Sequence, residues 1–293
     1  MKFNKYISTL SVVLMCWIQA LSETRLPQLP DGMTIPEDRA AYIMLHIWDF
    51  PENLASTEIA EQALSDFLSV AAAGIAPANA YAVAVDTLTA KAVEAGIDIF
   101  SLAAKYTSDP DAPFFDDELY LPFINAVLAT PVFLAKNPGL EEHLLYDREC
   151  ILKNRVGTKA ATFIIESTTG DNFEINTLYQ SPLNLLILFD PDCSHCRETL
   201  TKLSISHSLA KAVSDKRVNV IAVWVDAPDS PTSLSLPTVA GWHVVSDRTG
   251  IMDKDLYDLP IMPTIYVVDD KGIVIRKNLV GLQKILTALE LTD

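Results

Sequence analysis

The sequence is short of cysteine and of basic residues, and each shortage excludes a class of function. Its 293 residues include 4 cysteines, of which only Cys193 and Cys196 stand close together. A zinc site would need a second pair of ligands at close spacing, and covalent haem attachment would need histidine directly after Cys196, where Arg197 stands. Lysine and arginine number 22 against 38 acidic residues, a net charge of -16. Because the further ligands are missing, we expect no metal site. A chain of this charge would be repelled by phosphate, so we also expect no nucleic-acid partner and no binding to an anionic membrane surface.

Long apolar segments are also scarce. After the first 22 residues no stretch is long and apolar enough to span a bilayer. Residues 1–22 read as a secretory signal, with basic residues first, an apolar segment over 7–18 and small residues before a cleavage site near Glu23. Cys16 leaves a lipid anchor open, although Met15 before it is larger than the residue a lipobox normally has there. We therefore expect an exported protein of the periplasm or cell envelope, bound to the membrane only if lipid-anchored or if the signal stays uncleaved.

Residues 23–150 are expected to form an all-α domain. Apolar residues recur at helical spacing over 36–47, 56–68, 78–95, 97–106 and 118–129, and Ser56 has the chemistry of a helix cap. As far as Tyr146 this region holds no cysteine, no glycine-rich phosphate loop and no paired acid–base signature. The acidic run Asp116–Glu118 fits the first turn of a helix better than a metal site. His46 and Trp48 are more simply explained by core packing than by a binding groove.

Residues 151–293 show a different pattern, in which short strands alternate with helices. We expect a hairpin over 161–166 and 172–175, buried strands over 185–189 and 218–225, an edge strand over 242–245 and a second hairpin over 265–268 and 273–276. Helices are expected after Cys193, over 248–257 and over 282–291, and residues 228–237 are expected to form a loop rich in serine and proline. The predicted fold class is α/β, with a central mixed sheet flanked by helices.

The motif Cys193-Ser194-His195-Cys196 lies between a buried strand and a helix. Cys193 would stand at the helix N-terminus, where unpaired N–H groups and the helix dipole favour the thiolate. Cys196 lies one turn further along, close enough to form a small disulfide ring. This arrangement predicts a redox site, while a structural disulfide and a metal site remain alternatives.

The C-terminal half resembles the thioredoxin-fold domains of the TlpA/ResA type, which are exported thiol-disulfide proteins. The resemblance rests on the Cys193–Cys196 motif, on Met262-Pro263-Thr264 before the strand IYVVD, and on residues 154–163 at its start. It implies that Pro263 is cis and that Met262, Pro263 and Thr264 present a main-chain edge to an incoming peptide. The helical region resembles, more weakly, an uncharacterised domain that precedes such domains in Gram-negative envelope proteins, through residues 102–113 and 118–122.

Two positions depart from the family pattern. Thioredoxin has a buried aspartate on the strand that leads to the motif, where this chain has Ile187, and the usual aromatic residue before the first cysteine is replaced by Asp192. Asp192 opposes formation of the Cys193 thiolate, whereas protonated His195 favours it. Reductant, oxidant and isomerase therefore all remain open.

The sequence as a whole predicts an exported oxidoreductase that acts on protein disulfides. Cys193 would attack, Cys196 would resolve, and Asp192, Ser194 and His195 would tune the thiolate. No cofactor is needed, since the two sulfurs carry both electrons, and the partners would be protein disulfide clients and an upstream redox protein. The alternatives are a partner-binding envelope protein with a structural motif, and a redox sensor that also uses Cys150. We expect Cys150 itself to be a free thiol that takes no part in the chemistry.

Overall fold

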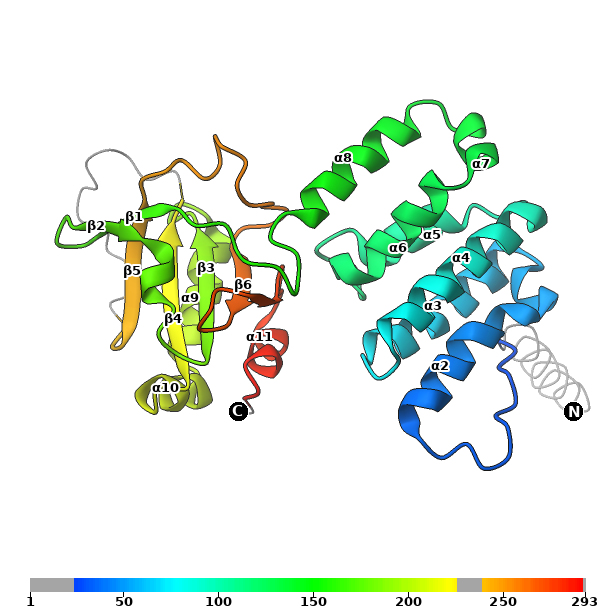
Figure 1. The fold of residues 1–293 in the computed structure, drawn as a ribbon, viewed down its shortest axis with the longest axis horizontal. Coiled ribbons are helices and arrows are strands. Elements are labelled where there is room, and N and C mark those ends of the chain that lie inside the picture. The colour runs from blue at the N-terminus through cyan, green and yellow to red at the C-terminus, as the bar shows by residue number, and fades with distance from the viewer. Residues whose placement is uncertain (1–23, 226–238, 292–293) are drawn as a thin grey trace, which may run out of the picture. The chain divides into compact units, whose positions relative to one another are not determined.

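The computed structural model describes residues 24–225 and 239–291. The expected signal segment and the expected loop over 228–237 lie outside these residues. The chain divides into two compact units between Leu144 and Leu145, and Figure 1 shows one to be helical and the other to contain a sheet. The division falls within α8 (Leu140–Leu152), a little ahead of the boundary at 150/151 that we expect from the sequence.

The helical unit contains all five helices that the sequence predicts. It is built from α2 (Pro36–His46), η1 (Ile47–Asp49), η2 (Pro51–Leu54), α3 (Thr57–Ala72), α4 (Ala78–Ala95), α5 (Ile99–Thr107), α6 (Asp117–Leu128), α7 (Pro131–Lys136) and the first part of α8. Ser56 caps α3 by accepting the N–H of Ile59 at 3.3 Å, and the Asp116 carboxylate caps α6 by accepting that of Glu118 at 2.8 Å. The acidic run thus lies at a helix start, as expected.

His46 and Trp48 have different environments, so the expectation that both pack in the core is half correct. The Trp48 side chain is 1% exposed and meets the Phe67 ring edge-on at a centroid distance of 5.6 Å. The His46 ring is 43% exposed and faces Asp49, with 2.8 Å between Nδ1 and Oδ2. Trp48 therefore belongs to the core, whereas His46 forms a surface pair.

The second unit is an α/β structure around one mixed sheet. Its strands are β1 (Ile164–Ser167), β2 (Asn172–Glu174), β3 (Leu183–Phe189), β4 (Val218–Trp224), β5 (Trp242–Asp247), β6 (Thr264–Val268) and β7 (Val274–Arg276). Among the described residues they form a 7-stranded sheet in the order β2-β1-β5-β4-β3-β6-β7. β3, β4 and β5 run parallel, and β6 lies antiparallel to β3. The helical elements are η3 (Ile175–Leu178), α9 (Ser194–Ser204), α10 (His207–Ser214) and α11 (Leu282–Ala288).

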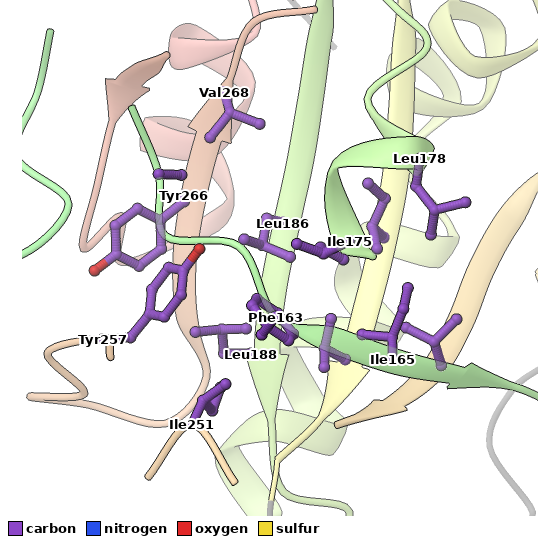
Figure 2. Packing of buried hydrophobic residues seen from close by; sticks show 14 of the residues in the cluster. Phe163, Ile165, Ile175, Leu178, Leu186, Leu188, Ile251, Tyr257, Tyr266 and Val268 are labelled. Carbon is purple, nitrogen blue, oxygen red and sulfur yellow. The ribbon is translucent and has the colours of Figure 1, made fainter. Parts of the chain in front are cut away.

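β3 is buried on both faces, as its unbroken apolar run predicts. Leu186 and Leu188 lie on one face, in a cluster with Phe163 and Tyr257 (Figure 2). Leu185, Ile187 and Phe189 face the opposite cluster, which includes apolar residues of α9, α10 and α11. Each of these side chains contributes about 1.5–3 kcal/mol by leaving water. The strand that leads to the two cysteines is therefore held on both sides.

Three predicted elements of this unit are wrong in detail. β5 is not an edge strand, because it lies between β1 and β4. Residues 248–257 form turns, since the Asp247 carboxylate accepts the N–H groups of Thr249 at 2.8 Å and Ile251 at 2.7 Å. The helix after the cysteines is divided into α9 and α10, and Ser206 caps α10 by accepting the N–H of Leu209 at 3.2 Å.

Candidate active site

Cys193 occupies the N-cap position of α9, directly after the turn that ends β3. Its N–H donates to the Asp190 carbonyl at 3.2 Å, and its sulfur accepts the N–H of Cys196 at 3.4 Å. The side chain is partly buried. A sulfur in this position faces the unpaired N–H groups of the first helical turn, which stabilise a thiolate.

Cys196 lies one turn further along α9 and is 0% exposed. It packs against the apolar side chains of β3 and α11. This burial raises the pKa of the Cys196 thiol from 9.0 to about 12, against a smaller opposing effect of a main-chain hydrogen bond from Asp190. The two cysteines therefore differ in environment, one within reach of solvent and the other enclosed.

The Met262–Pro263 segment lies beside Cys193 because β6 pairs with β3. The Met262–Pro263 peptide bond is cis, the conformation expected from the motif. The Cys193 thiol donates to the Met262 carbonyl at 3.8 Å. Pro263 is buried, and the hydroxyl of buried Thr264 donates to the Ile261 carbonyl. The structure thus brings the two predicted segments, far apart in the sequence, to one place.

The three residues expected to tune the thiolate are exposed at the turn and in the first turn of α9. These are Asp192, Ser194 and His195. Among the described residues, the hydrogen bonds that reach Cys193 and Cys196 come from other groups. Any effect of these three side chains on the sulfurs is therefore electrostatic and weakened by solvent.

Asp190 and Arg197, which the sequence pattern does not single out, hold the turn between β3 and α9 in place. The Asp190 carboxylate accepts the N–H of Asp192 at 2.8 Å, and Arg197 donates to the Pro191 carbonyl at 2.7 Å. Both contacts hold the turn that presents Cys193. The sequence pattern marks Asp190 only as part of a strand-ending turn, and the position directly after a buried strand is the signal that could have singled it out.

Two further sequence expectations concern Ile187 and Cys150. Ile187 is 0% exposed and belongs to the same apolar cluster as Cys196. Cys150 is a free, partly buried thiol on α8. Burial raises the pKa of the Cys150 thiol, against a smaller opposing effect of a hydrogen bond with Tyr146.

In the described part of the chain, no three side chains of histidine, cysteine, aspartate or glutamate gather where a metal ion could be held. Within the same residues, every helix is too short or too polar to cross a membrane.

Comparison with known families divides the chain at nearly the same place as the sequence pattern. A family model described as a domain of unknown function (DUF5106) matches residues 2–154, more than half of the chain. The protein belongs to this DUF5106 family. The model of the AhpC/TSA family matches residues 156–277, and this C-terminal part is a thioredoxin-like domain. The resemblance and the fold class expected from the sequence are confirmed.

Three solved structures are similar to the chain, and the first of them, which spans both parts of it, agrees with this assignment. A thioredoxin-like protein from Bacteroides caccae is 27% identical, with a TM-score of 0.73, and the match covers 92% of this chain and 98% of that one. A conserved protein of unknown function from Bacteroides fragilis is 28% identical over 46% of this chain and 98% of its own, with a TM-score of 0.42. The thioredoxin domain of a thiol-disulfide oxidoreductase from Bacteroides vulgatus is 20% identical over 46% and 95%, with a TM-score of 0.38. No curated protein matches the chain.

Proposed function

We propose that this protein is an exported thiol-disulfide oxidoreductase that acts on disulfides of other proteins. The observation that carries the proposal is the arrangement of the two cysteines. Cys193 is accessible at the N-cap of α9, and Cys196 lies buried one turn behind it, with its N–H 3.4 Å from the Cys193 sulfur. An accessible thiol stabilised by backbone N–H groups, with a second thiol behind it, is suited to disulfide exchange.

The reaction would take place in two exchange steps. The Cys193 thiolate attacks a client disulfide, which gives a mixed disulfide between Cys193 and the client and releases the client's other sulfur. Cys196 then attacks the Cys193 sulfur, so that the Cys193–Cys196 disulfide forms and the reduced client leaves. The client gains two electrons and the two cysteines lose them, and the reverse sequence oxidises a client. The direction depends on the reduction potential of the pair relative to that of its compartment.

The segment Met262-Pro263-Thr264 is the proposed client-binding edge. The Met262 carbonyl already accepts the Cys193 thiol at 3.8 Å, so an extended peptide alongside it would have its sulfur near the nucleophile. Main-chain pairing of this kind depends little on the client's side chains. Asp192, Ser194 and His195, exposed around Cys193, would tune its thiolate.

The proposed location is the periplasm or cell envelope, where an upstream redox protein would restore the cysteine pair. The support is the signal-like segment over residues 1–22, with its basic start and apolar centre. A measured reduction potential would then assign the direction of electron flow.

The proposal is tested by reduction of insulin disulfides and by trapping of clients. Cys193→Ser should abolish insulin reduction. Cys196→Ser should accumulate covalent client adducts that disappear with reductant, because resolution then needs a second molecule. Cys150→Ser is the control and should match the wild type. Activity that survives Cys193→Ser would contradict the proposal and favour a structural or sensing role for the motif, and adducts formed equally well through Cys196 alone would reverse the assignment of the nucleophile.

A further inference from the structure

A pocket of about 310 Å³ opens at the end of the sheet away from the cysteines. Three segments line it: the residues before β1, η3 with the residue that follows it, and the turn between β6 and β7. The lining residues are Lys159, Asn176, Thr177, Tyr179, Asp270 and Lys271. The last residue of β6, Val268, lies opposite Asn184 near the start of β3, whereas Cys193 follows the other end of β3. The pocket is therefore separate from the redox site.

Hydrogen bonds hold the walls of this pocket in place. The Asp269 carboxylate accepts the N–H of Lys271 at 2.9 Å, which fixes the turn between β6 and β7. The N–H of Ala160 donates to the Gly272 carbonyl at 2.8 Å, so the segment before β1 is tied to the same turn. The Tyr179 ring packs against Gly272, where an added Cβ would lie 3.3 Å from the ring. The pocket is therefore formed before any ligand arrives, and its volume lies at the lower end of the range for small-molecule sites.

Three charged side chains at the pocket have no partner of opposite charge. Lys159, Lys271 and Asp270 are exposed, and among the described residues none of them lies within 4.0 Å of an opposite charge. Lysines elsewhere do pair with carboxylates, as Lys91 and Lys202 show, and the chain has 38 acidic residues against 22 basic ones. Two unpaired cations and one unpaired anion around a pocket are complementary to a ligand with the opposite set of charges.

The neutral polar side chains of the pocket add acceptors. The Asn176 amide nitrogen donates to the Glu174 carboxylate at 3.1 Å, whereas its carbonyl oxygen is buried and accepts no hydrogen bond from the described part of the chain. The Thr177 hydroxyl donates to the Glu174 carbonyl at 2.7 Å, which leaves its lone pairs free for a ligand. A buried acceptor without a donor is unfavourable, so a ligand that brings a donor to Asn176 is favoured.

We propose that this pocket binds an acidic amino acid, a small molecule with two carboxylates and one ammonium group. The two carboxylates pair with Lys159 and Lys271, and the ammonium group donates to the Asp270 carboxylate and the Asn176 carbonyl. An ammonium group has three protons to donate, and hydrogen bonds between charged groups are about twice as strong as those between neutral ones. The inference goes beyond the proposed function and does not depend on it, because neither cysteine of the motif lines the pocket.

Ligands of other chemistry match these charges less well. A sugar phosphate or a dicarboxylate pairs with the two lysines but brings no cation to Asp270, which then repels it. A neutral sugar leaves all three charged side chains without a partner. An amino acid with a neutral side chain satisfies Asp270 but only one lysine. The two carboxylates and the ammonium group are therefore each tested by a ligand that lacks one of them.

The experiment titrates the full-length protein with L-glutamate and L-aspartate and follows the main-chain amide signals of Lys159, Lys271 and Gly272 by NMR. Low ionic strength is used, since salt screens exposed charges. Glutarate lacks the ammonium group, and glutamine has an amide in place of one carboxylate. Lys159→Gln, Lys271→Gln and Asp270→Asn each remove one charge from an exposed side chain. The control is Lys284→Gln, because Lys284 is an exposed lysine of α11 outside the pocket.

We expect saturable shifts with an acidic amino acid, and dissociation constants about fivefold higher for glutarate and for glutamine than for glutamate. Lys159→Gln and Lys271→Gln should each weaken glutamate binding by about fivefold and reduce the preference for glutamate over glutamine. Asp270→Asn should bring the affinities for glutamate and glutarate within about twofold of each other, because the group that recognises the ammonium is lost. Lys284→Gln and Cys193→Ser should bind glutamate as the wild type does.

The inference is overturned if neither acidic amino acid gives saturable shifts, or if the wild type binds glutarate as tightly as glutamate. It also fails if Lys284→Gln weakens binding as much as the two pocket variants do, since net charge rather than the pocket would then be responsible. Binding that is lost in Cys193→Ser would show that the site is not separate from the cysteines, and would overturn it too. A wild-type protein that binds glutamate but reduces no insulin contradicts the proposed function alone.

Discussion

At the scale of single residues, Cys193 and Cys196 stand only three positions apart in the sequence but differ in their surroundings. Cys193 precedes the first helical residue and reaches solvent, whereas Cys196 turns inward and is 0% exposed. The helix accounts for the difference, because a side chain at the N-cap and one a turn later meet different surroundings. A single short motif thereby provides both an attacking thiol and a protected one.

We predict that iodoacetamide labels Cys193 and spares Cys196 in the reduced, folded protein at pH 8. Because the pKa of the Cys196 thiol is raised from 9.0 to about 12, its thiolate fraction is about a thousandfold below that of an ordinary cysteine. Because only the thiolate reacts, labelling of Cys196 should increase as the pH is raised above 9. Peptide mass mapping measures both sites, and labelling in denaturant is the control, in which both cysteines should react. Equal labelling of the two cysteines in the folded protein would contradict the prediction.

At the scale of elements, β3 combines an apolar run with one buried amide that fixes its pairing. Asn184 is 0% exposed and lies opposite Val268 of β6. Its side-chain nitrogen is 2.9 Å from the Ser181 carbonyl and 3.3 Å from that of Val268. A shift of β6 by one residue would lose the bond to Val268 and reverse which β6 side chains face each cluster.

Replacement of Asn184 by alanine should lower the free energy of unfolding by about 1–3 kcal/mol, because buried carbonyl groups lose their donor. The measurement is urea unfolding followed by circular dichroism. The control is Asn172→Ala, at an exposed position of the edge strand β2, which should change the free energy by about 0.5 kcal/mol or less. An effect of Asn184→Ala no larger than that of the control would show that the amide does not fix the register.

The sequence predicts those elements whose signal is local. The β3 run, the Ser56 cap and the hairpin turn over 169–171 are read correctly because neighbouring residues decide them. The division between α9 and α10 is missed, since Leu200, Leu203, Leu209 and Val213 continue at roughly helical spacing across it and the Ser206 cap lies within the pattern. The inner position of β5 depends on pairing with β1, about eighty residues away, and no local pattern reports that.

The candidate site is predictable to the same degree. The two cysteines and the segment from Met262 to Thr264 follow from motifs. The part of Asp190 does not, because it arises only when the turn brings its carbonyl to the N–H of Cys193 and its carboxylate to that of Asp192.

At the scale of the whole molecule, the family models and the compact units place the start of the thioredoxin-like domain differently. The AhpC/TSA model starts at residue 156, whereas the compact unit starts at Leu145. The segment between these two points is bonded to the later part of the domain. Asn154, 9% exposed, donates to the Leu256 carbonyl at 2.8 Å and accepts the N–H of Ala161 at 2.7 Å. Lys277 donates to the Ile151 carbonyl at 2.8 Å, and Lys153 pairs with Asp255.

We therefore predict that a chain beginning at Leu145 is more stable than one beginning at Val156, although both retain Cys193 and Cys196. Loss of the buried Asn154 contacts alone should lower the free energy of unfolding by about 1–3 kcal/mol. Loss of the ion pair between Lys153 and the exposed Asp255 should add little to this. Urea unfolding of the two chains measures the difference in their free energies of unfolding. Domains of this size usually unfold in a single two-state transition, so the two values can be compared. Asn154→Ala in the longer chain should reproduce a large share of the loss. Equal unfolding midpoints for the two chains would mean that the domain begins where the family model does, and that residues 145–155 contribute nothing to its stability.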